Sequence, residues 1–305
     1  MGAIEARGLK KRYGDTVAAA DVSLDVGSGE IYGVLGRNGA GKTTVVEMIA
    51  GLRRPDAGSV RVLGLDPWQD RSRVRQVLGV QLQEAALHGA LTVGELVRLH
   101  RTFYRDGADP AELIERVGLT GQRGTRFDKL SGGQRQRVSV ALALAGRPRA
   151  VILDELSTGL DPEARRGMWA MVERLRDDGV TVVLVSHLME EVERLCDRVA
   201  LIDAGRVVAV DTPSGLVRRA GLDQVMRFRA AGPFDPAVLE RVDVVHSVRT
   251  ADERVVVTGT GDLLQAVSTA LVRADVTVLD TSFQQAGLED AFLALTGDPF
   301  DGEER

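Results

Sequence analysis

The stretch Gly36-Arg37-Asn38-Gly39-Ala40-Gly41-Lys42-Thr43 fits the pattern G-x-x-x-x-G-K-[ST]. The apolar run Ile31–Leu35 stands before it, and Thr43–Ala50 after it carries apolar side chains at helical spacing. Glycines let the backbone N–H groups of such a loop point inward at phosphate oxygens, and the following helix adds its positive N-terminal end. The stretch therefore predicts an α/β fold with a nucleotide site at this loop.

The residues of the loop have separate expected roles. We expect Lys42 to bridge the β and γ phosphates and the Thr43 hydroxyl to bind Mg²⁺. The predicted nucleotide-binding set is Gly36, Arg37, Asn38, Gly39, Ala40, Gly41, Lys42, Thr43 and Thr44. The alternative is a chance match in a chain with 34 glycines, and the strand before and the helix after argue against it.

Two later stretches extend this pattern. Leu130-Ser131-Gly132-Gly133-Gln134 opens a predicted helix, and free amide groups at a helix start can bind an anion. Val151-Ile152-Leu153-Asp154-Glu155 is an apolar strand that ends in two carboxylates. Asp154 can bind Mg²⁺ directly or through water, while Glu155 points elsewhere because side chains alternate along a strand. Taken alone, the first stretch would indicate only a helix cap and the second only an acidic strand end.

In this order the three stretches resemble the ATP-binding cassette ATPases, and the resemblance covers residues 1 to 215. It implies a P-loop NTPase fold with a RecA-like core sheet, an antiparallel β subdomain and a helical subdomain. It also implies a dimer in which Ser131, Gly132, Gly133 and Gln134 bind the γ-phosphate of ATP held by a second copy. ATP binding would close that dimer and hydrolysis would open it.

The same resemblance implies further catalytic residues. Glu155 would polarise the attacking water, and His187 would touch the γ-phosphate. Gln83 matches the family's Q-loop and would contact Mg²⁺ or the water, with Gln81 as its rival in register. The expected catalytic residues are Glu155, His187, Lys42 and Gln83, and the expected Mg²⁺ ligands are Thr43, Gln83 and Asp154.

Two more positions match the family. Tyr13 matches an aromatic residue that stacks on adenine, and an ordinary turn tyrosine is the alternative. Ser157-Thr158-Gly159-Leu160-Asp161-Pro162 resembles the family's D-loop, which includes Asp161. The family usually has proline where this chain has Leu156. That position takes no part in the chemistry, so we expect no loss of activity.

The order of predicted elements divides the chain into domains. We predict a nucleotide-binding domain at 1–218, with a helical subdomain at 84–148, and a small α+β domain at 222–297. Ile4–Leu9 and Ser23–Val26 are typical of antiparallel strands. In the last domain, the order β-α-β-β-α-β, with its fourth strand at 276–279, is ferredoxin-like. The polar tail 298–305 is predicted to be disordered.

Composition narrows the classes of partner. The net charge of −5 gives no basic field for nucleic acid, so no nucleic-acid partner is expected. No apolar stretch approaches the roughly 18 residues that a membrane-spanning helix needs. A single cysteine, Cys196, excludes an intrachain disulfide and fits a reducing cytosol. A membrane role would therefore require a separate integral membrane subunit.

The end of the chain favours one kind of cassette. Leu288–Gly297 resembles the ending of bacterial exporter subunits similar to daunorubicin-resistance ATP-binding proteins. We therefore predict an exporter ATPase at the cytoplasmic face of the cell membrane, with residues 83–93 beside a coupling helix of a membrane permease subunit. One alternative is a soluble, non-transport cassette ATPase. A second is a regulatory module without turnover, against which Lys42, Asp154, Glu155 and His187 argue. We expect the C-terminal domain to stabilise or regulate the dimer.

Overall fold

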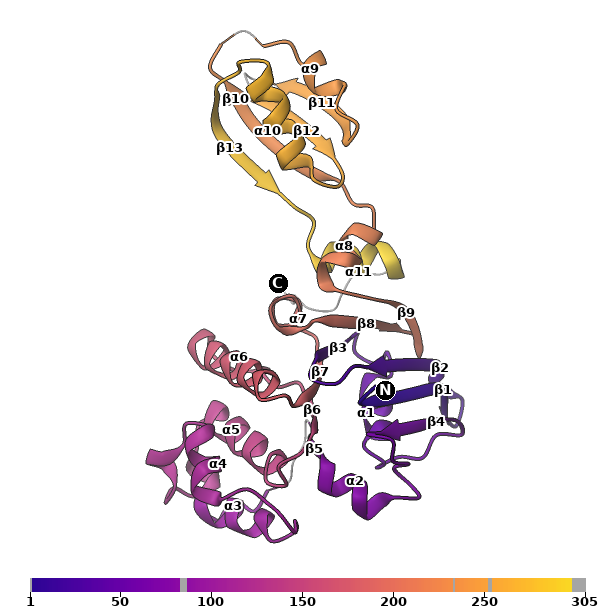
Figure 1. Ribbon diagram of the computed structural model, residues 1–305, viewed down its shortest axis with the longest axis vertical. Coiled ribbons are helices and arrows are strands. Elements are labelled where there is room, and N and C mark those ends of the chain that lie inside the picture. Colours follow the sequence, from indigo (N-terminus) through magenta and orange to yellow (C-terminus); the bar gives the residue numbers. More distant parts are fainter. Residues whose placement is uncertain (1, 83–86, 233, 252–253, 298–305) are drawn as a thin grey trace. The chain divides into compact units, whose positions relative to one another are not determined.

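The computed structural model describes residues 2–82, 87–232, 234–251 and 254–297. The chain forms two compact units, of which the first ends at Pro213 and the second begins at Ser214. Figure 1 shows the elements of each unit, and the two units are described here one at a time.

The core of the first unit is a set of parallel strands. In the described part of this unit the sheet order is β4-β1-β2-β9-β8-β3-β7-β6-β5. Within this order, the strands from β8 to β5 run parallel to one another. They are β3 (Ile31–Leu35), β5 (Leu78–Gln81), β6 (Ala150–Asp154), β7 (Thr181–Ser186) and β8 (Arg198–Asp203). Every residue of β3, β6 and β7 is buried, as expected for parallel strands covered on both faces. The predicted RecA-like core is confirmed.

An antiparallel region continues the same sheet. β1 (Ile4–Tyr13) pairs antiparallel with both β2 (Thr16–Val26) and β4 (Ala57–Val62). β9 (Arg206–Asp211) pairs antiparallel with β8 and meets β2 at Asp21. Alternating apolar side chains of β1, β2 and β4 pack against α1 (Lys42–Ile49) in one core. The predicted antiparallel β subdomain is therefore confirmed.

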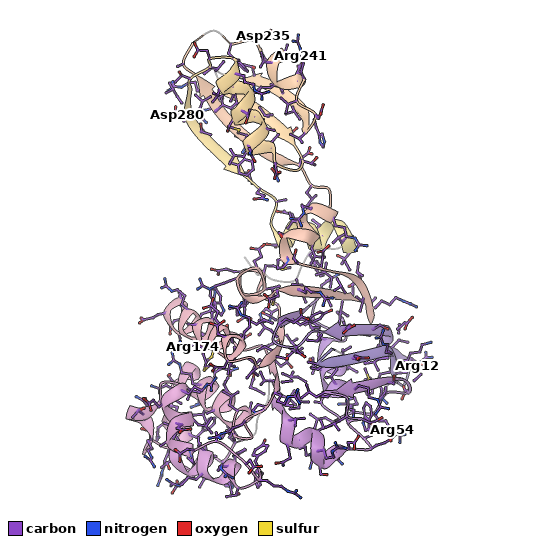
Figure 2. The ribbon with its side chains drawn as sticks, in the orientation of Figure 1. Arg12, Arg54, Arg174, Asp235, Arg241 and Asp280 are labelled. Atoms are coloured by element: carbon purple, nitrogen blue, oxygen red, sulfur yellow. The ribbon has the colours of Figure 1, made fainter. Side chains whose placement is uncertain are left out.

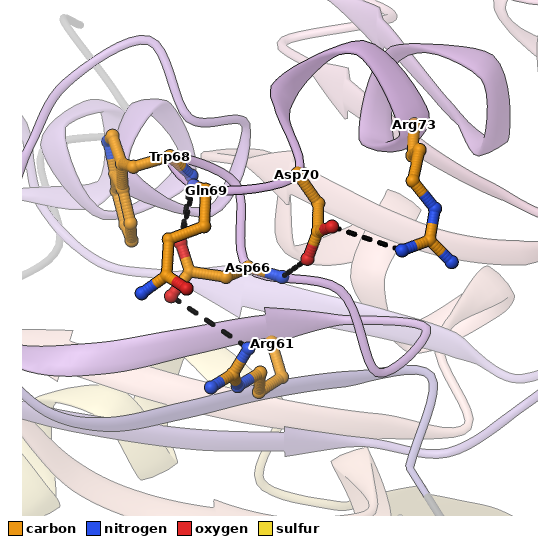
Figure 3. A network of polar contacts seen from close by, with 6 residues as sticks. All are labelled: Arg61, Asp66, Trp68, Gln69, Asp70 and Arg73. Carbon is orange, nitrogen blue, oxygen red and sulfur yellow. Dashed lines mark hydrogen bonds and ion pairs between the residues drawn. The ribbon is translucent and has the colours of Figure 1, made fainter.

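Helices connect the parallel strands. α6 (Pro162–Asp177) follows β6, and α7 (Met189–Leu195) follows β7. α2 (Arg71–Val77), which precedes β5, is absent from the sequence prediction because its residues are mostly polar. A short network of hydrogen bonds and ion pairs, rather than an apolar face, holds the start of this helix (Figure 3). The Asp66 carboxylate accepts hydrogen bonds from the backbone N–H of Trp68 and Gln69, and Asp70 pairs with Arg73 at 3.0 Å.

The helical subdomain lies between β5 and β6. It contains α3 (Val93–Arg101), α4 (Pro110–Arg116) and α5 (Gly132–Ala143), which pack on one another. Thr92 and Glu95 form a capping box at the start of α3, in which the Glu95 carboxylate accepts from the Thr92 N–H at 2.8 Å. Two 3₁₀ turns, Thr120–Gln122 and Phe127–Lys129, link α4 to α5.

The second unit has its own sheet and core. It begins with α8 (Pro213–Arg219), followed by β10 (Gln224–Ala230), α9 (Ala237–Glu240), β11 (Val245–Ala251), β12 (Arg254–Gly259), α10 (Leu263–Arg273), β13 (Val278–Gln284) and α11 (Leu288–Thr296). Its four strands are ordered β11-β12-β10-β13 and pair antiparallel. With the strands numbered 1 to 4 in chain order, the sheet order is 2-3-1-4, and α9 and α10 follow the first and third strands.

One strand of this unit differs from its predicted range. β13 continues to Gln284, five residues beyond the predicted end at Leu279. Most of its side chains are exposed, and Asp280 has a positive φ of 50°. A polar edge strand of this kind lacks the apolar alternation from which strands are predicted.

Charged side chains lie on the surface of the first unit. Figure 2 shows Arg12 and Arg54 extending outward from its antiparallel region. Among the helices of the described residues, none combines the length and apolarity needed to cross a membrane.

Candidate nucleotide site

The glycine-rich loop after β3 is closely packed against its neighbours. Gly39 and Gly41 have positive φ values of 81° and 99°, which side chains rarely adopt. A Cβ added at Gly41 would lie 2.0 Å from the Ala18 carbonyl oxygen of β2. A Cβ at Gly36 would lie 2.2 Å from the Ile202 carbonyl oxygen of β8. Gly41 and Gly36 are therefore required by close backbone contacts, with β2 and with β8 respectively.

Lys42 begins α1 and folds back under this loop. Its Nζ donates hydrogen bonds to the carbonyl oxygens of Gly36 at 2.6 Å and Arg37 at 2.9 Å. The side chain is buried, and burial lowers the pKa of Lys42, an effect opposed by the charges of Glu155 and Asp154. These contacts put the ammonium group inside the curve of the loop, where a phosphate would also lie.

Asp154 is a buried carboxylate at the end of β6. Its exposed fraction is 1%, and its Oδ2 atom has no hydrogen-bond partner among the described residues. Burial raises the pKa of Asp154 to about 6, the Glu155 charge adds to this shift, and Lys42 opposes it. A buried carboxylate oxygen that lacks a donor is costly unless a cation binds it. Since Mg²⁺ prefers oxygen ligands, Asp154 fits a magnesium site.

Gln81 supports Asp154, a contact that the sequence does not reveal. The Gln81 Oε1 atom accepts from the Asp154 N–H at 3.1 Å, and its Nε2 donates to the Asp154 carbonyl at 3.2 Å. The side chain thus extends the β5–β6 ladder past its last backbone pair, Gln81 with Leu153. Gln81 is engaged with the backbone, whereas its rival Gln83 lies outside the described residues.

Glu155 and His187 meet beside Asp154. Glu155 has a positive φ of 52°, and its N–H donates to the Val185 carbonyl at 2.9 Å. Its Oε1 atom lies 3.5 Å from Nδ1 of His187, which comes directly after β7. β6 and β7 are parallel neighbours, so their carboxyl ends bring these two side chains together.

Tyr13 stands at the end of β1. Lys11 and Arg53 lie near its ring, with their charged groups 5.7 Å and 5.1 Å from the ring centroid. The Tyr13 side chain is partly exposed, at 38%. Its exposed ring is therefore accessible to a base that enters from solvent.

Ser131 and Asp161 both act as helix caps in this structure. Ser131 Oγ accepts from the Gln134 N–H, and Gln134 Oε1 accepts from the Ser131 N–H, which forms a capping box at the start of α5. Asp161 Oδ1 accepts from the N–H groups of Glu163 and Ala164 at the start of α6. A Cβ at Gly133 would lie 3.5 Å from Leu160 and from Ala164, so the two helix starts are neighbours.

The predicted site residues fall into two groups, one at the glycine-rich loop and one in the helical subdomain. Lys42, Asp154 and Glu155 interact electrostatically, and His187 lies against Glu155. Ser131 lies in the helical subdomain, on a helix that packs against α3, α4, β5 and α6. A phosphate loop beside a buried carboxylate, a second carboxylate and a histidine defines a P-loop nucleotide hydrolase.

The comparisons with known proteins specify the family. The family model described as ABC transporter matches residues 19–158. The chain is 38% identical to the daunorubicin resistance ATP-binding protein DrrA3 of Streptomyces coeruleorubidus, over 97% of this chain and 96% of that protein. It is 36% identical to the Nod factor export ATP-binding protein I of Burkholderia lata, over 96% of this chain and 97% of that protein. The chain belongs to the ABC transporter ATP-binding proteins, and it is an ATPase.

A solved structure matches a smaller share of this chain than the sequence relatives do. The dimeric cassette MJ0796, a bacterial ABC transporter cassette, matches with a TM-score of 0.62 and 26% identity. The match covers 98% of that cassette but 68% of this chain. The two sequence relatives, by contrast, match almost the full length of this chain.

Proposed function

We propose that the chain is the ATP-hydrolysing subunit of an exporter and works as a dimer of two copies at the cytoplasmic face of the membrane. The observation that carries this proposal is the 3.5 Å approach of Glu155 to His187, beside buried Lys42 and Asp154. The full-length likeness to resistance and export proteins supports the direction of transport.

Each ATP would be held between the two copies. The loop Gly36–Thr44 and Lys42 would hold the phosphates, and Tyr13 would stack on adenine. In the other copy, Ser131 accepts a hydrogen bond within its own helix cap, which leaves its hydroxyl proton available to donate to the γ-phosphate. Gly132, Gly133 and Gln134 would add the N-terminal amides of α5. Asp161, which caps α6, would lie at the same junction.

Hydrolysis would use Glu155 as the general base. The carboxylate would take a proton from water as the water oxygen attacks the γ-phosphorus and the bond to the bridging oxygen of ADP breaks. His187 would hold the γ-phosphate and keep Glu155 in place. Thr43, Asp154 and Gln83 would hold Mg²⁺, which supplies positive charge to the phosphates when bound.

A groove on the first unit suits a membrane partner. The groove is a cavity of about 570 Å³ between the helical subdomain and the core. Its lining residues are Ala50, Leu52, Ser72, Val74, Arg75, Gln76, Leu78, Val80, Phe103 and Tyr104. Leu52 and Phe103 are large apolar residues that are 54% and 63% exposed. Exposed apolar side chains at a groove are typical of a docking site, and we infer that a helix of the permease subunit binds here.

The catalytic assignment is tested with Glu155→Gln. Steady-state ATP hydrolysis is expected to fall by about a hundredfold or more, because the base is lost. ATP affinity should stay within a few fold, and an ATP-bound dimer should accumulate in size-exclusion chromatography. Unchanged turnover would remove Glu155 as the base.

The partner is tested by purification from native membranes in mild detergent. Tagged Glu155→Gln protein with ATP is expected to bring a stoichiometric membrane-spanning protein with it. Leu52→Glu combined with Phe103→Asp should abolish that recovery. The matched control is Val272→Glu on α10, where the valine is 78% exposed and outside the groove. A clean dimer with no membrane protein would favour the non-transport alternative instead.

A further inference from the structure

Glu191 is a carboxylate with no exposed surface. It lies on α7, the helix that begins two residues after His187, and its exposed fraction is 0%. In the described part of the chain it forms no ion pair, and its Oε2 atom has no hydrogen-bond partner. Burying a carboxylate in this way is costly, because the charged group is removed from water. Glu191 is therefore poorly explained by stability alone.

The other oxygen of Glu191 joins two separate segments. Its Oε1 atom accepts hydrogen bonds from the Ser157 hydroxyl and from the Trp169 indole Nε1, the latter at 3.0 Å. Ser157 comes two residues after Glu155, and its own exposed fraction is 1%. Trp169 lies on α6, the helix that follows the same loop. One carboxylate thus fixes the segment after the predicted base to the helix after the predicted histidine.

This contact lies next to the strained part of the site. Glu155 holds a left-handed φ of 52°, so the turn that places its side chain needs support from its surroundings. Ser157 also accepts a backbone hydrogen bond from Leu160 at 3.3 Å, and Leu160 lies close to Gly133 at the start of α5. A shift of Ser157 would therefore move both Glu155 and the residues beside the signature helix.

We propose that Glu191 is a positioning residue for ATP hydrolysis, which holds Ser157 and so keeps Glu155 against His187. Glu191 touches neither nucleotide nor water in this role. The inference rests on the proposed roles of Glu155 and His187, and it assigns a function to a side chain outside the family motifs used above. It predicts that the bond to Ser157 affects turnover rather than ATP binding.

The test measures steady-state ATP hydrolysis and ATP affinity in the full-length chain. Ser157→Ala and Glu191→Leu are each expected to lower kcat by about tenfold or more, because small displacements of a base are costly and leucine has no atom that can accept from Ser157. The KM for ATP should stay within twofold. Ser157→Thr keeps the hydroxyl and should restore kcat. Glu193→Gln is the matched control, because Glu193 is an exposed residue on the same helix.

A double variant separates positioning from folding. Ser157→Ala combined with Glu191→Leu should lower kcat no further than the more severe single change, because each removes the same bond between Ser157 and Glu191. Wild-type kcat in Ser157→Ala, multiplied effects in the double variant, or an equal loss in Glu193→Gln would overturn the proposal. Glu155→Gln run alongside distinguishes the two failures. If that variant is inactive while Ser157→Ala is normal, only the role of Glu191 is wrong.

Discussion

The two sheets of this protein differ in whether the ends of their strands bring functional residues together. In the first unit, parallel strands β5, β6, β3 and β7 all finish at one edge. That edge collects Gln81, Asp154, the glycine-rich loop and His187, although they are far apart in sequence. In the second unit, neighbouring strands of the sheet run antiparallel, so adjacent strands finish at opposite edges. A parallel sheet therefore assembles a site from many segments, whereas this antiparallel sheet supplies mainly a core.

The largest expected effect is at the loop of the parallel edge. Gly41→Ala should lower the free energy of unfolding by roughly 3 kcal/mol or more, from a left-handed backbone and a forced contact with Ala18. Gly39→Ala is the matched control: its φ is also positive, but no atom lies within 4 Å of the added Cβ, so about 1 kcal/mol is expected. Denaturant unfolding without nucleotide measures both. Equal losses would show that packing against β2 does not shape the loop.

A second variant removes the side chain that extends this edge. Gln81→Leu leaves the N–H and the carbonyl of Asp154 buried without their present partners, which should cost about 1–3 kcal/mol. Mg²⁺-dependent turnover should fall as well, because the Asp154 backbone is no longer fixed. Unfolding curves and the Mg²⁺ dependence of kcat provide the measurement. A variant with wild-type values in both would show that the β5–β6 ladder holds Asp154 by itself.

Removing the antiparallel sheet tests whether it acts on the dimer. Truncation after Gly221 should leave ATP binding by the monomer within twofold, since the described contacts of the loop are within the first unit. The ATP-induced dimer should weaken by about threefold to tenfold, near 1 kcal/mol. Analytical ultracentrifugation with the Glu155→Gln background measures this. An unaffected dimer would leave the second unit without a role in pairing.

The smallest effect concerns a buried phenol on β3. Burial raises the pKa of Tyr32 to about 12, Arg198 opposes the shift, and Glu30 and Asp25 add to it. Tyr32 therefore contributes stability that is complete below its unfolded pKa of 10 and is lost as pH rises through 12. Tyr32→Phe should be nearly neutral at pH 8, because the Oη atom has no hydrogen-bond partner in the described residues. The stability of wild type relative to this variant should fall between pH 10 and 12. A constant difference across that range would place the hydroxyl in contact with solvent.

The features that could be predicted from the sequence are those that a local pattern of residues encodes. The glycine-rich loop and the parallel core follow from spacing and apolar runs alone. The bonds of Gln81 to Asp154 and of Ser157 to Glu191 join residues 73 and 34 positions apart, so no local pattern reveals them. α2 was not predicted for a different reason. Hydrogen bonds of polar groups, rather than an apolar face, hold its start.

Lys42 has a consequence for nucleotide exchange. Its ammonium group bonds two carbonyls of the loop that it serves, so it acts as an internal template for the loop's curvature. The conformational entropy of the loop is then lost during folding rather than at each binding event. When ADP leaves, the loop keeps the shape that the next ATP needs. The rate of exchange should accordingly depend on the opening of the proposed dimer and not on re-forming the loop.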